Sequence, residues 1–175
     1  IHSIISAWSV LANLADDMRN LQRSEIAEIG EEFEDKQVGS STMPHKRNPI
    51  NFENVKSMWK AFMPRMVTSY LDQISDHQRD LTNSASSRWN GETVAGFAAS
   101  ISRMIRTMNK LKVDEANLKR NFDMNADMVI AEPLYILLAA YGHPNAHEYV
   151  RELTLESQRS GAPFKEVMRS QGEIQ

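Results

Sequence analysis

The chain has 175 residues, of which 41% are hydrophobic and 25% charged, values that are typical of a globular domain. A formal net charge of -3 at pH 7 gives no reason to expect a nucleic-acid partner, so any anion-binding site must depend on local cations. The absence of cysteine excludes a disulfide framework and thiol catalysis, and no apolar run reaches the roughly 18 residues of a membrane span, so we expect a cytoplasmic protein without a membrane partner.

Helices are predicted on both sides of a polar central loop. Apolar residues recur at spacings of three and four and predict a helix over about residues 3–22. A second helix is expected to begin after Asn48 and Pro49, because asparagine caps helices and proline suits the first helical position. It should continue to about Tyr70 with a kink at Pro64, rather than an end there.

A third helix is predicted from about Ser84 to Leu111, with one apolar face that we expect to be buried. That face consists of Val94, Phe97, Ile101, Met104, Ile105, Met108 and Leu111. Only a short piece around residues 27–33 suggests a strand. Helices of this length are too long for a small isolated unit, so bundling with further copies of the chain is expected.

The pattern changes after Lys112 to shorter periodic runs that are separated by the turns at 142–144 and 161–163. We therefore predict an all-α fold, with a long-helix bundle over residues 1–112 and the start of a small helical domain over residues 113–175. An amphipathic pattern is already running at the first residues, from which we expect that preceding sequence is missing.

The segment from Gly39 to Pro49 reads GSSTMPHKRNP and lies in a predicted loop over residues 36–50. Backbone N–H groups in such a segment, together with cations, complement carboxylate or phosphate oxygens. Removal of a proton beside a carboxylate builds a second negative charge, which the Lys46 ammonium and the Asn48 amide could stabilise. Ser40 is a poor base unless its ionised form is stabilised in the same way. Alone, Gly39-Ser40-Ser41 would be typical of a linker.

A second polar motif, His77 to Arg88, reads HQRDLTNSASSR. Ser84 lies four residues before Arg88, so on a helix the two side chains would face one ligand. Arginine with serine is a suitable clamp for a phosphate monoester. Without further information, Arg79 and Arg88 are more often solvated or paired with nearby acidic residues.

The loop resembles the GSSxMPxKxNP signature of the fumarase/aspartase superfamily, lyases that eliminate fumarate from succinyl compounds, and every fixed position is filled. The second motif is similar to the pattern of the adenylosuccinate lyase family. The resemblance implies elimination of fumarate from adenylosuccinate, giving AMP, and from the succinylaminoimidazole carboxamide ribotide of purine biosynthesis. It implies a nucleotide substrate, no metal or organic cofactor, and a homotetramer whose active sites are shared between subunits. The acid of the family lies outside this chain, so the chain alone should be inactive.

The resemblance also implies roles for the loop residues. Ser40 matches the general base of the family, and Ser41 lies beside it among the substrate-binding residues. Lys46 and Asn48 match the groups that hold the succinyl carboxylates. Glu53 matches a glutamate that orients a histidine from another segment, although alone it would suit a first helical turn equally well.

Residues of the second motif match family members that contact the nucleotide. Arg79, Ser84 and Arg88 take this role, with Ser84 and Arg88 at the phosphate. The chain departs from commoner members at Ser86 and Ser87, where a bulkier or acidic pair is frequent.

Two other functions remain open from the sequence. A carboxymuconate cycloisomerase of the same superfamily shares the loop wording but has no phosphate to bind and no need of Ser84 and Arg88. A non-catalytic helical scaffold would need neither Ser40 nor Lys46.

Two further patterns receive plain interpretations. We expect the acidic run between Glu25 and Asp35 to form a solvated face. His143 and His147 have a spacing that suits a metal, but no third ligand is near in the sequence, so no metal site is predicted.

Overall fold

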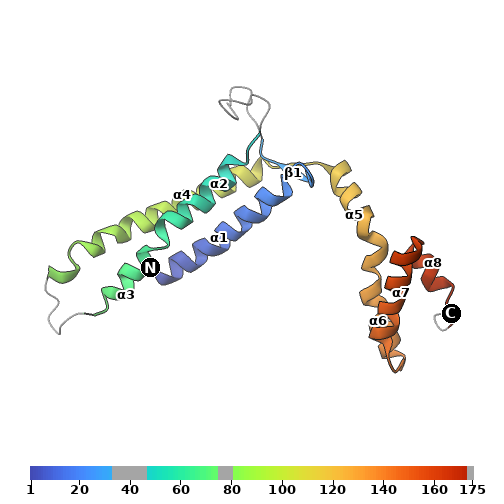
Figure 1. Cartoon of the computed structure of the whole chain (residues 1–175). Coiled ribbons are helices and arrows are strands. Elements are labelled where there is room, and N and C mark those ends of the chain that lie inside the picture. Colours follow the sequence, from blue (N-terminus) through green and yellow to red (C-terminus); the bar gives the residue numbers. More distant parts are fainter. Residues whose placement is uncertain (33–46, 75–80, 173–175) are drawn as a thin grey trace. The chain divides into compact units, whose positions relative to one another are not determined.

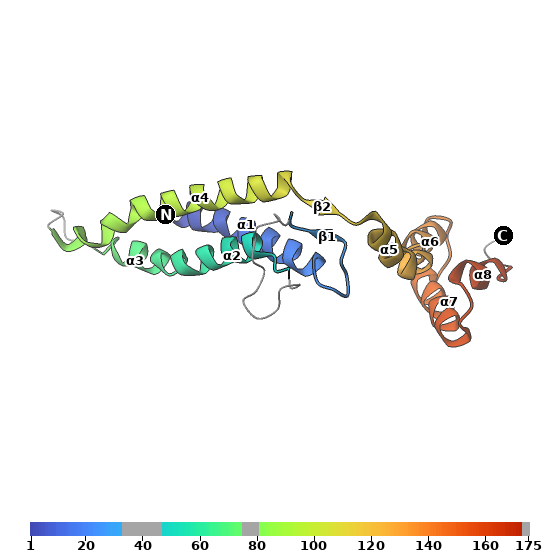
Figure 2. The same cartoon turned by 90° about the horizontal axis from the view of Figure 1, so that it is seen from above.

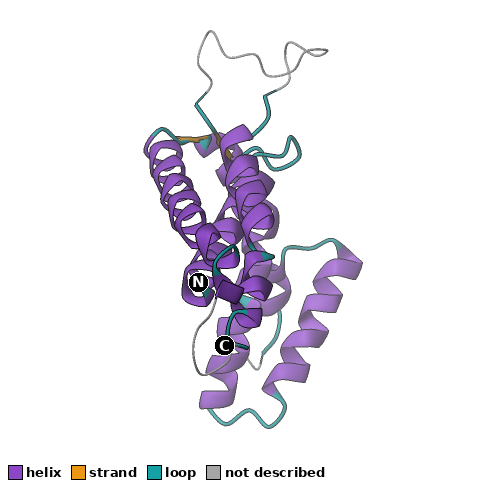
Figure 3. Cartoon of the chain, turned by 90° about the vertical axis from the view of Figure 1, so that its left-hand side faces the viewer, coloured by secondary structure: helices purple, strands orange, loops and turns teal. Residues whose placement is uncertain are grey.

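The computed structural model describes residues 1–32, 47–74 and 81–172. Most of these residues are helical, and Figure 3 shows one short strand pair among them, which confirms the all-α prediction. The chain divides into two compact units, Ile1–Glu115 and Ala116–Gln175, whereas the predicted boundary fell after Lys112. No helix among the described residues combines the length and the apolar character needed to cross a membrane.

The first unit is a bundle of three long helices, α1 (His2–Leu21), α2 (Ile50–Phe62) and α4 (Trp89–Asn109), which run side by side (Figures 1 and 2). Trp8 of α1 is fully buried and its ring stacks on Phe62 of α2, with 5.3 Å between the ring centroids. Phe52 and Val55 of α2 pack with Ala15 and Met104 in the same core. The first helix therefore lies as its apolar spacing predicted.

The second predicted helix is divided in two. Helix α2 ends at Phe62, and α3 (Arg65–Leu71) begins after Pro64, so the expectation of a kink within one helix was wrong. Proline has no N–H group for the helical ladder, although Met63 and Pro64 keep right-handed helical dihedral angles. The predicted cap is displaced by one residue, because the cap position of α2 is occupied by Pro49 and not by Asn48.

The third helix begins later than predicted. Two 3₁₀ turns, η1 (Leu81–Asn83) and η2 (Ser86–Arg88), precede α4, which starts at Trp89 rather than near Ser84. Helices α3 and α4 lie at the same end of the bundle, and α4 runs back along it (Figure 1).

The buried face of α4 also differs from the prediction. Within the chain, α4 buries mainly small or polar residues, namely Thr93, Gly96, Ser100, Met104 and Thr107. The hydroxyls of Thr93 and Thr107 donate to backbone carbonyls one turn earlier, which removes the cost of burying them. Most of the predicted apolar face is exposed, and Val94 and Ile105 are 49% and 55% exposed. The apolar periodicity predicted that one face of α4 is buried. Close packing against Trp8 instead buries the face that carries the small residues.

Two short strands, one after α1 and one after α4, pair with each other in this unit. Strand β1 (Ile29–Gly30) pairs antiparallel with β2 (Lys112–Val113), with Ile29 opposite Val113. The piece around residues 27–33 thus contains a strand, as expected. Its partner was not predicted, because two residues are too few for alternation to be visible.

The second unit contains α5 (Glu115–Val129) except for its first residue, together with α6 (Ala131–Ala140), α7 (Ala146–Ser160) and α8 (Phe164–Arg169). Its core is formed by Val150, Leu153, Phe164 and Val167. Gly161 ends α7 with a φ of +71°, a conformation that glycine adopts without a steric penalty. These helices agree with the small helical unit expected after residue 112.

Candidate functional site

The residues predicted to carry function are only partly described. Ser40, Ser41, Lys46 and Arg79 lie outside the described residues. The other four fall into two places in the first unit: Asn48 and Glu53 at the start of α2, and Ser84 and Arg88 around the 3₁₀ turns before α4.

At the start of α2, the chain enters the helix directly from the signature loop. The Asn48 carbonyl accepts from the N–H of Ile50 at 2.8 Å, and the Pro49 carbonyl accepts from the N–H of Glu53 at 2.9 Å. Glu53 lies in the first turn with its side chain exposed, where a carboxylate is stabilised by the helix dipole. The backbone of both residues is therefore placed at one end of the bundle, next to the loop in the sequence.

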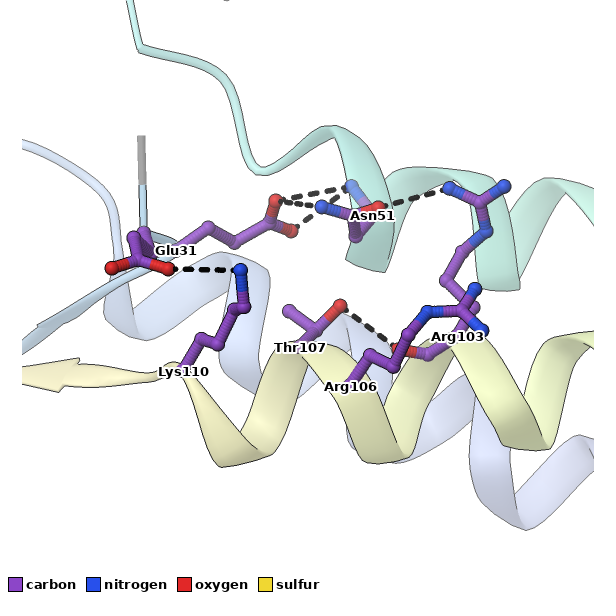
Figure 4. Close-up of a pocket in the computed structure, with 7 residues that line it drawn as sticks. Glu31, Asn51, Arg103, Arg106, Thr107 and Lys110 are labelled. Atoms are coloured by element: carbon purple, nitrogen blue, oxygen red, sulfur yellow. Dashed lines mark hydrogen bonds and ion pairs between the residues drawn. The ribbon is translucent and has the colours of Figure 1, made fainter. Parts of the chain in front are cut away.

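A charged hollow of about 230 Å³ lies beside this helix start (Figure 4). It is lined by Glu31, Glu32, Asn51, Arg103, Arg106, Thr107 and Lys110. The Glu31 carboxylate accepts from the backbone N–H groups of Asn51 and Phe52 at 3.0 and 2.9 Å. It therefore caps α2, and the interpretation of the acidic run as a solvated face was wrong for Glu31. The sequence offered no signal for this, because the cap comes from outside the local sequence of the helix.

At the second motif, the polar residues surround another hollow. Ser84 lines it together with Ser69, Asp72, Gln73, Leu81, Asn83, Ser87 and Asn90. Asp72, at the end of α3, holds the turns in place. Its side-chain carboxylate accepts from the Ser86 hydroxyl at 2.6 Å, and its backbone carbonyl accepts from the Asn83 side-chain amide at 2.9 Å. Serine at position 86 thus has a structural partner in this chain.

The four-residue spacing predicted that Ser84 and Arg88 face one ligand from the same α-helix. In the structure they do not share a turn of one α-helix. Ser84 follows η1, and its N–H donates to the Leu81 carbonyl at 3.0 Å, whereas Arg88 closes η2 with an exposed side chain. Only Ser84 lines the hollow. The two residues remain near each other in the chain, on successive short turns.

The described residues of the two motifs lie at opposite ends of the first unit. Helices α2 and α3 run from Ile50 to Leu71 between them, and at about 1.5 Å per residue this corresponds to roughly 30 Å. Figures 1 and 2 show the start of α2 and the start of α4 at the two ends of the bundle. Within one chain, Asn48 and Glu53 therefore lie at the opposite end of this unit from Ser84 and Arg88.

The described part of the chain contains no cluster of side chains that could hold a metal ion. There, no three histidine, aspartate or glutamate side chains gather as a metal site would require. His143 and His147 each pack against a tyrosine ring instead.

Comparison with known families gives a clear assignment for this arrangement. The family model for the adenylosuccinate lyase C-terminal region matches residues 75–175, and a lyase family model matches residues 4–63. The chain belongs to the adenylosuccinate lyase family. The matched regions contain the second motif and the helix start that follows the loop.

Curated relatives in the adenylosuccinate lyase family are similar over most of the chain. The adenylosuccinate lyase of Pyrococcus abyssi is 38% identical over 94% of this chain and 37% of its own length. The enzyme of Methanothermobacter thermautotrophicus is 35% identical over 94% of the chain and 39% of its own length. That of Bacillus subtilis is 30% identical, with the same coverage of both. The chain thus spans less than two fifths of these relatives.

Solved structures show the same fold. A 3-carboxy-cis,cis-muconate lactonizing enzyme from Pseudomonas putida has a TM-score of 0.73 at 22% identity, covering 98% of this chain and 40% of its own. A fumarate lyase from Mesorhizobium sp. BNC1 has a TM-score of 0.71 at 18% identity, covering 98% of this chain and 37% of its own. At these identities the likeness supports the helical-bundle architecture rather than a particular substrate.

Proposed function

We propose that the protein to which this chain belongs eliminates fumarate from adenylosuccinate, giving AMP, and from the succinylaminoimidazole carboxamide ribotide of purine biosynthesis. The observation that carries this proposal is the 38% identity with an adenylosuccinate lyase over 94% of the chain, including both polar motifs. The chain supplies the loop end and the phosphate end of the site. The acid comes from sequence outside it.

The residue chemistry suits this elimination. Ser40 removes a proton from the carbon beside a carboxylate, and the electron pair of that C–H bond forms the C=C bond of fumarate. The C–N bond breaks, and an acid protonates the leaving nitrogen. Lys46 and Asn48 stabilise the negative charge that builds on the carboxylate, while Ser41 helps to hold the substrate. Glu53 orients a histidine of another segment.

The substrate site is shared between copies of the chain. The described residues of the two motifs lie at opposite ends of one bundle, which supports the proposal that a nucleotide held by Arg79, Ser84 and Arg88 of one subunit reaches the loop of a different subunit. The exposed apolar face of α4 favours self-association, since it would otherwise leave Val94, Ile101, Ile105 and Met108 in water. We propose a homotetramer. The cytoplasmic location stays a prediction from the sequence.

The cycloisomerase alternative has a specific observation on its side, the fold likeness to the P. putida enzyme. That likeness has a lower sequence identity than the match to adenylosuccinate lyases, 22% against 38%, and it does not explain Ser84 and Arg88. A scaffold without catalysis would explain neither motif.

The test is an assay of the full-length protein with each substrate. Incubation with adenylosuccinate should give AMP and fumarate in equal amounts, followed by ultraviolet absorbance, while 3-carboxymuconate should remain unchanged. A Ser40→Ala preparation purified in the same way controls for contaminating enzyme. Turnover of 3-carboxymuconate, or no release of fumarate, would contradict the proposed function.

A further inference from the structure

The two ends of the signature loop are joined by a hydrogen-bond network that the sequence did not indicate. Glu31 lies just before the loop and Asn51 just after it. Besides accepting from two backbone N–H groups of α2, the Glu31 carboxylate accepts from the Asn51 side-chain amide at 2.7 Å (Figure 4). The N–H of Glu31 itself donates to the Gln22 side chain at 3.0 Å, which fixes the glutamate to the end of α1.

The network continues into α4. The Asn51 side-chain oxygen accepts from the Arg103 guanidinium at 2.9 Å, so both polar atoms of this amide have partners (Figure 4). Arg103 thereby orients Asn51 with its nitrogen toward Glu31. The three side chains connect the segment before the loop, the first turn of α2 and helix α4.

This capping differs from that of an ordinary helix. The first backbone N–H groups of a helix need acceptors, and a side chain at the cap position usually supplies one. Proline at position 49 cannot, and a carboxylate from an earlier segment takes its place. A negative charge there is also stabilised by the helix dipole. Loss of Glu31 would therefore leave the α2 start uncapped and release the segment before the loop from the helix after it.

We propose that Glu31 and Arg103, acting through Asn51, are positioning residues for the elimination reaction. They fix both ends of the segment that carries the base and the carboxylate-binding groups, without touching the substrate. The inference rests on the proposed function, because it assigns the purpose of the network to that loop. It adds two residues to the site, of which one comes from a helix that neither motif includes.

Matched neighbours separate this role from a general effect of charge. Glu32 lines the same hollow but pairs with Lys110 at 3.2 Å on the surface, and among the described residues its side chain does not cap α2. Arg106 lines it too and lies one helical turn after Arg103 on α4. Glu32→Ala therefore changes the charge of the hollow by as much as Glu31→Ala does, and Arg106→Met by as much as Arg103→Met does. Both controls leave the network intact.

The experiment compares Glu31→Ala, Glu31→Gln, Arg103→Met and the two controls in the full-length protein. Losing a helix cap of this kind should lower kcat for adenylosuccinate about tenfold in Glu31→Ala. The Kd for AMP should change less than about twofold, because its phosphate contacts lie at the other end of the bundle. Glu31→Gln, which keeps one acceptor oxygen, should recover part of kcat, and Arg103→Met should fall between it and Glu31→Ala. Both controls should match wild type.

Hydrogen exchange measured by mass spectrometry gives a readout that does not depend on activity. The peptide that contains the N–H groups of Asn51 and Phe52 should exchange faster in Glu31→Ala than in Glu32→Ala. If wild type shows no lyase activity but the exchange differs, the proposed function fails while the anchoring holds. Equal exchange in the two variants, equal kcat in them, or a loss of AMP affinity as large as the loss of kcat would overturn the inference.

A variant that unfolds would also be informative. If Glu31→Ala is not folded at the assay temperature, Glu31→Gln and Arg103→Met carry the test. Wild-type kcat in both of these folded variants would refute the positioning role.

Discussion

Arg88 closes the turn before α4 with an exposed side chain, and Ser84, four residues earlier, lines a hollow. If the pair binds the phosphate of the nucleotide, Arg88→Met removes a charge-assisted contact of roughly 1.5 to 3 kcal/mol. The affinity for AMP should fall about tenfold to a hundredfold, whereas fumarate should bind as before. Calorimetric titration of the full-length variant with each ligand measures both effects.

A control for that titration lies on the same helix. Arg106→Met removes the same charge from the opposite end of α4 and should leave AMP affinity unchanged. Equal AMP affinity in wild type and Arg88→Met would remove the main reason for a nucleotide substrate. Loss of fumarate binding instead would place Arg88 at the dicarboxylate and favour a cycloisomerase.

Ser40 gives the second prediction at this scale. In the full-length protein, Ser40→Ala should abolish turnover while nucleotide binding stays nearly intact, because the hydroxyl acts on the transition state more than on the ground state. Steady-state kinetics and AMP titration of one preparation separate the two effects. Should more than about a tenth of kcat remain, a barrier change under about 1.4 kcal/mol, Ser40 is not the base.

Two glycines in α4 show how this helix packs. A Cβ atom on Gly96 would lie 3.0 Å from the Trp8 ring and 3.1 Å from the Phe62 ring, whereas one on Gly91 would meet nothing within 4 Å. Gly96→Ala should therefore destabilise the protein by about 1 to 3 kcal/mol through overpacking. Gly91→Ala should stabilise it by about 0.5 to 1 kcal/mol, because glycine costs conformational entropy in a helix.

Chemical denaturation of the full-length variants gives the two free energies of unfolding. The changes in these free energies relative to wild type should have opposite signs, since the substitution is the same and only the space around it differs. A stabilising Gly96→Ala would mean that Trp8 and Phe62 move apart easily, and that close packing does not select the buried face of α4.

At the scale of elements, helix existence was predictable and helix orientation was not. The spacing of apolar residues correctly predicted α1 and the region of α2, because one periodic face suffices for a buried helix. In α4 the same reasoning selected Val94 and Ile105, which are exposed in the chain. A helix with one small and one apolar face can pack on both, and periodicity alone does not say which neighbour takes which face.

At the scale of the whole molecule, the separation of Asn48 and Glu53 from Ser84 and Arg88 predicts that two inactive variants restore activity when their subunits are mixed. Full-length Ser40→Ala and Arg88→Met variants, mixed in equal amounts after dissociation and reassociated, should form sites that combine the intact loop of one copy with the intact Arg88 of another. Random assembly makes about a quarter of such sites intact when each takes the two motifs from different subunits. Fumarate release at low substrate concentration should rise accordingly.

A second mixture tests whether reassociation itself causes the gain. Ser40→Ala mixed with Lys46→Met places both defects in one loop, so no site is restored and activity should stay at the level of the separate variants. Failure of the first mixture to exceed the second would show that both motifs act within one subunit.

The sequence by itself determined the helical class and predicted a chemistry for the candidate site, because apolar periodicity and the types and order of polar side chains are local properties. It predicted Ser40, Lys46, Asn48 and Glu53 near one another for the same reason, although only the last two lie among the described residues. It could not predict that Glu31 caps α2 or that Arg103 orients Asn51. Those contacts join residues 20 to 52 positions apart, and only the packing of α1, α2 and α4 brings them within hydrogen-bond distance.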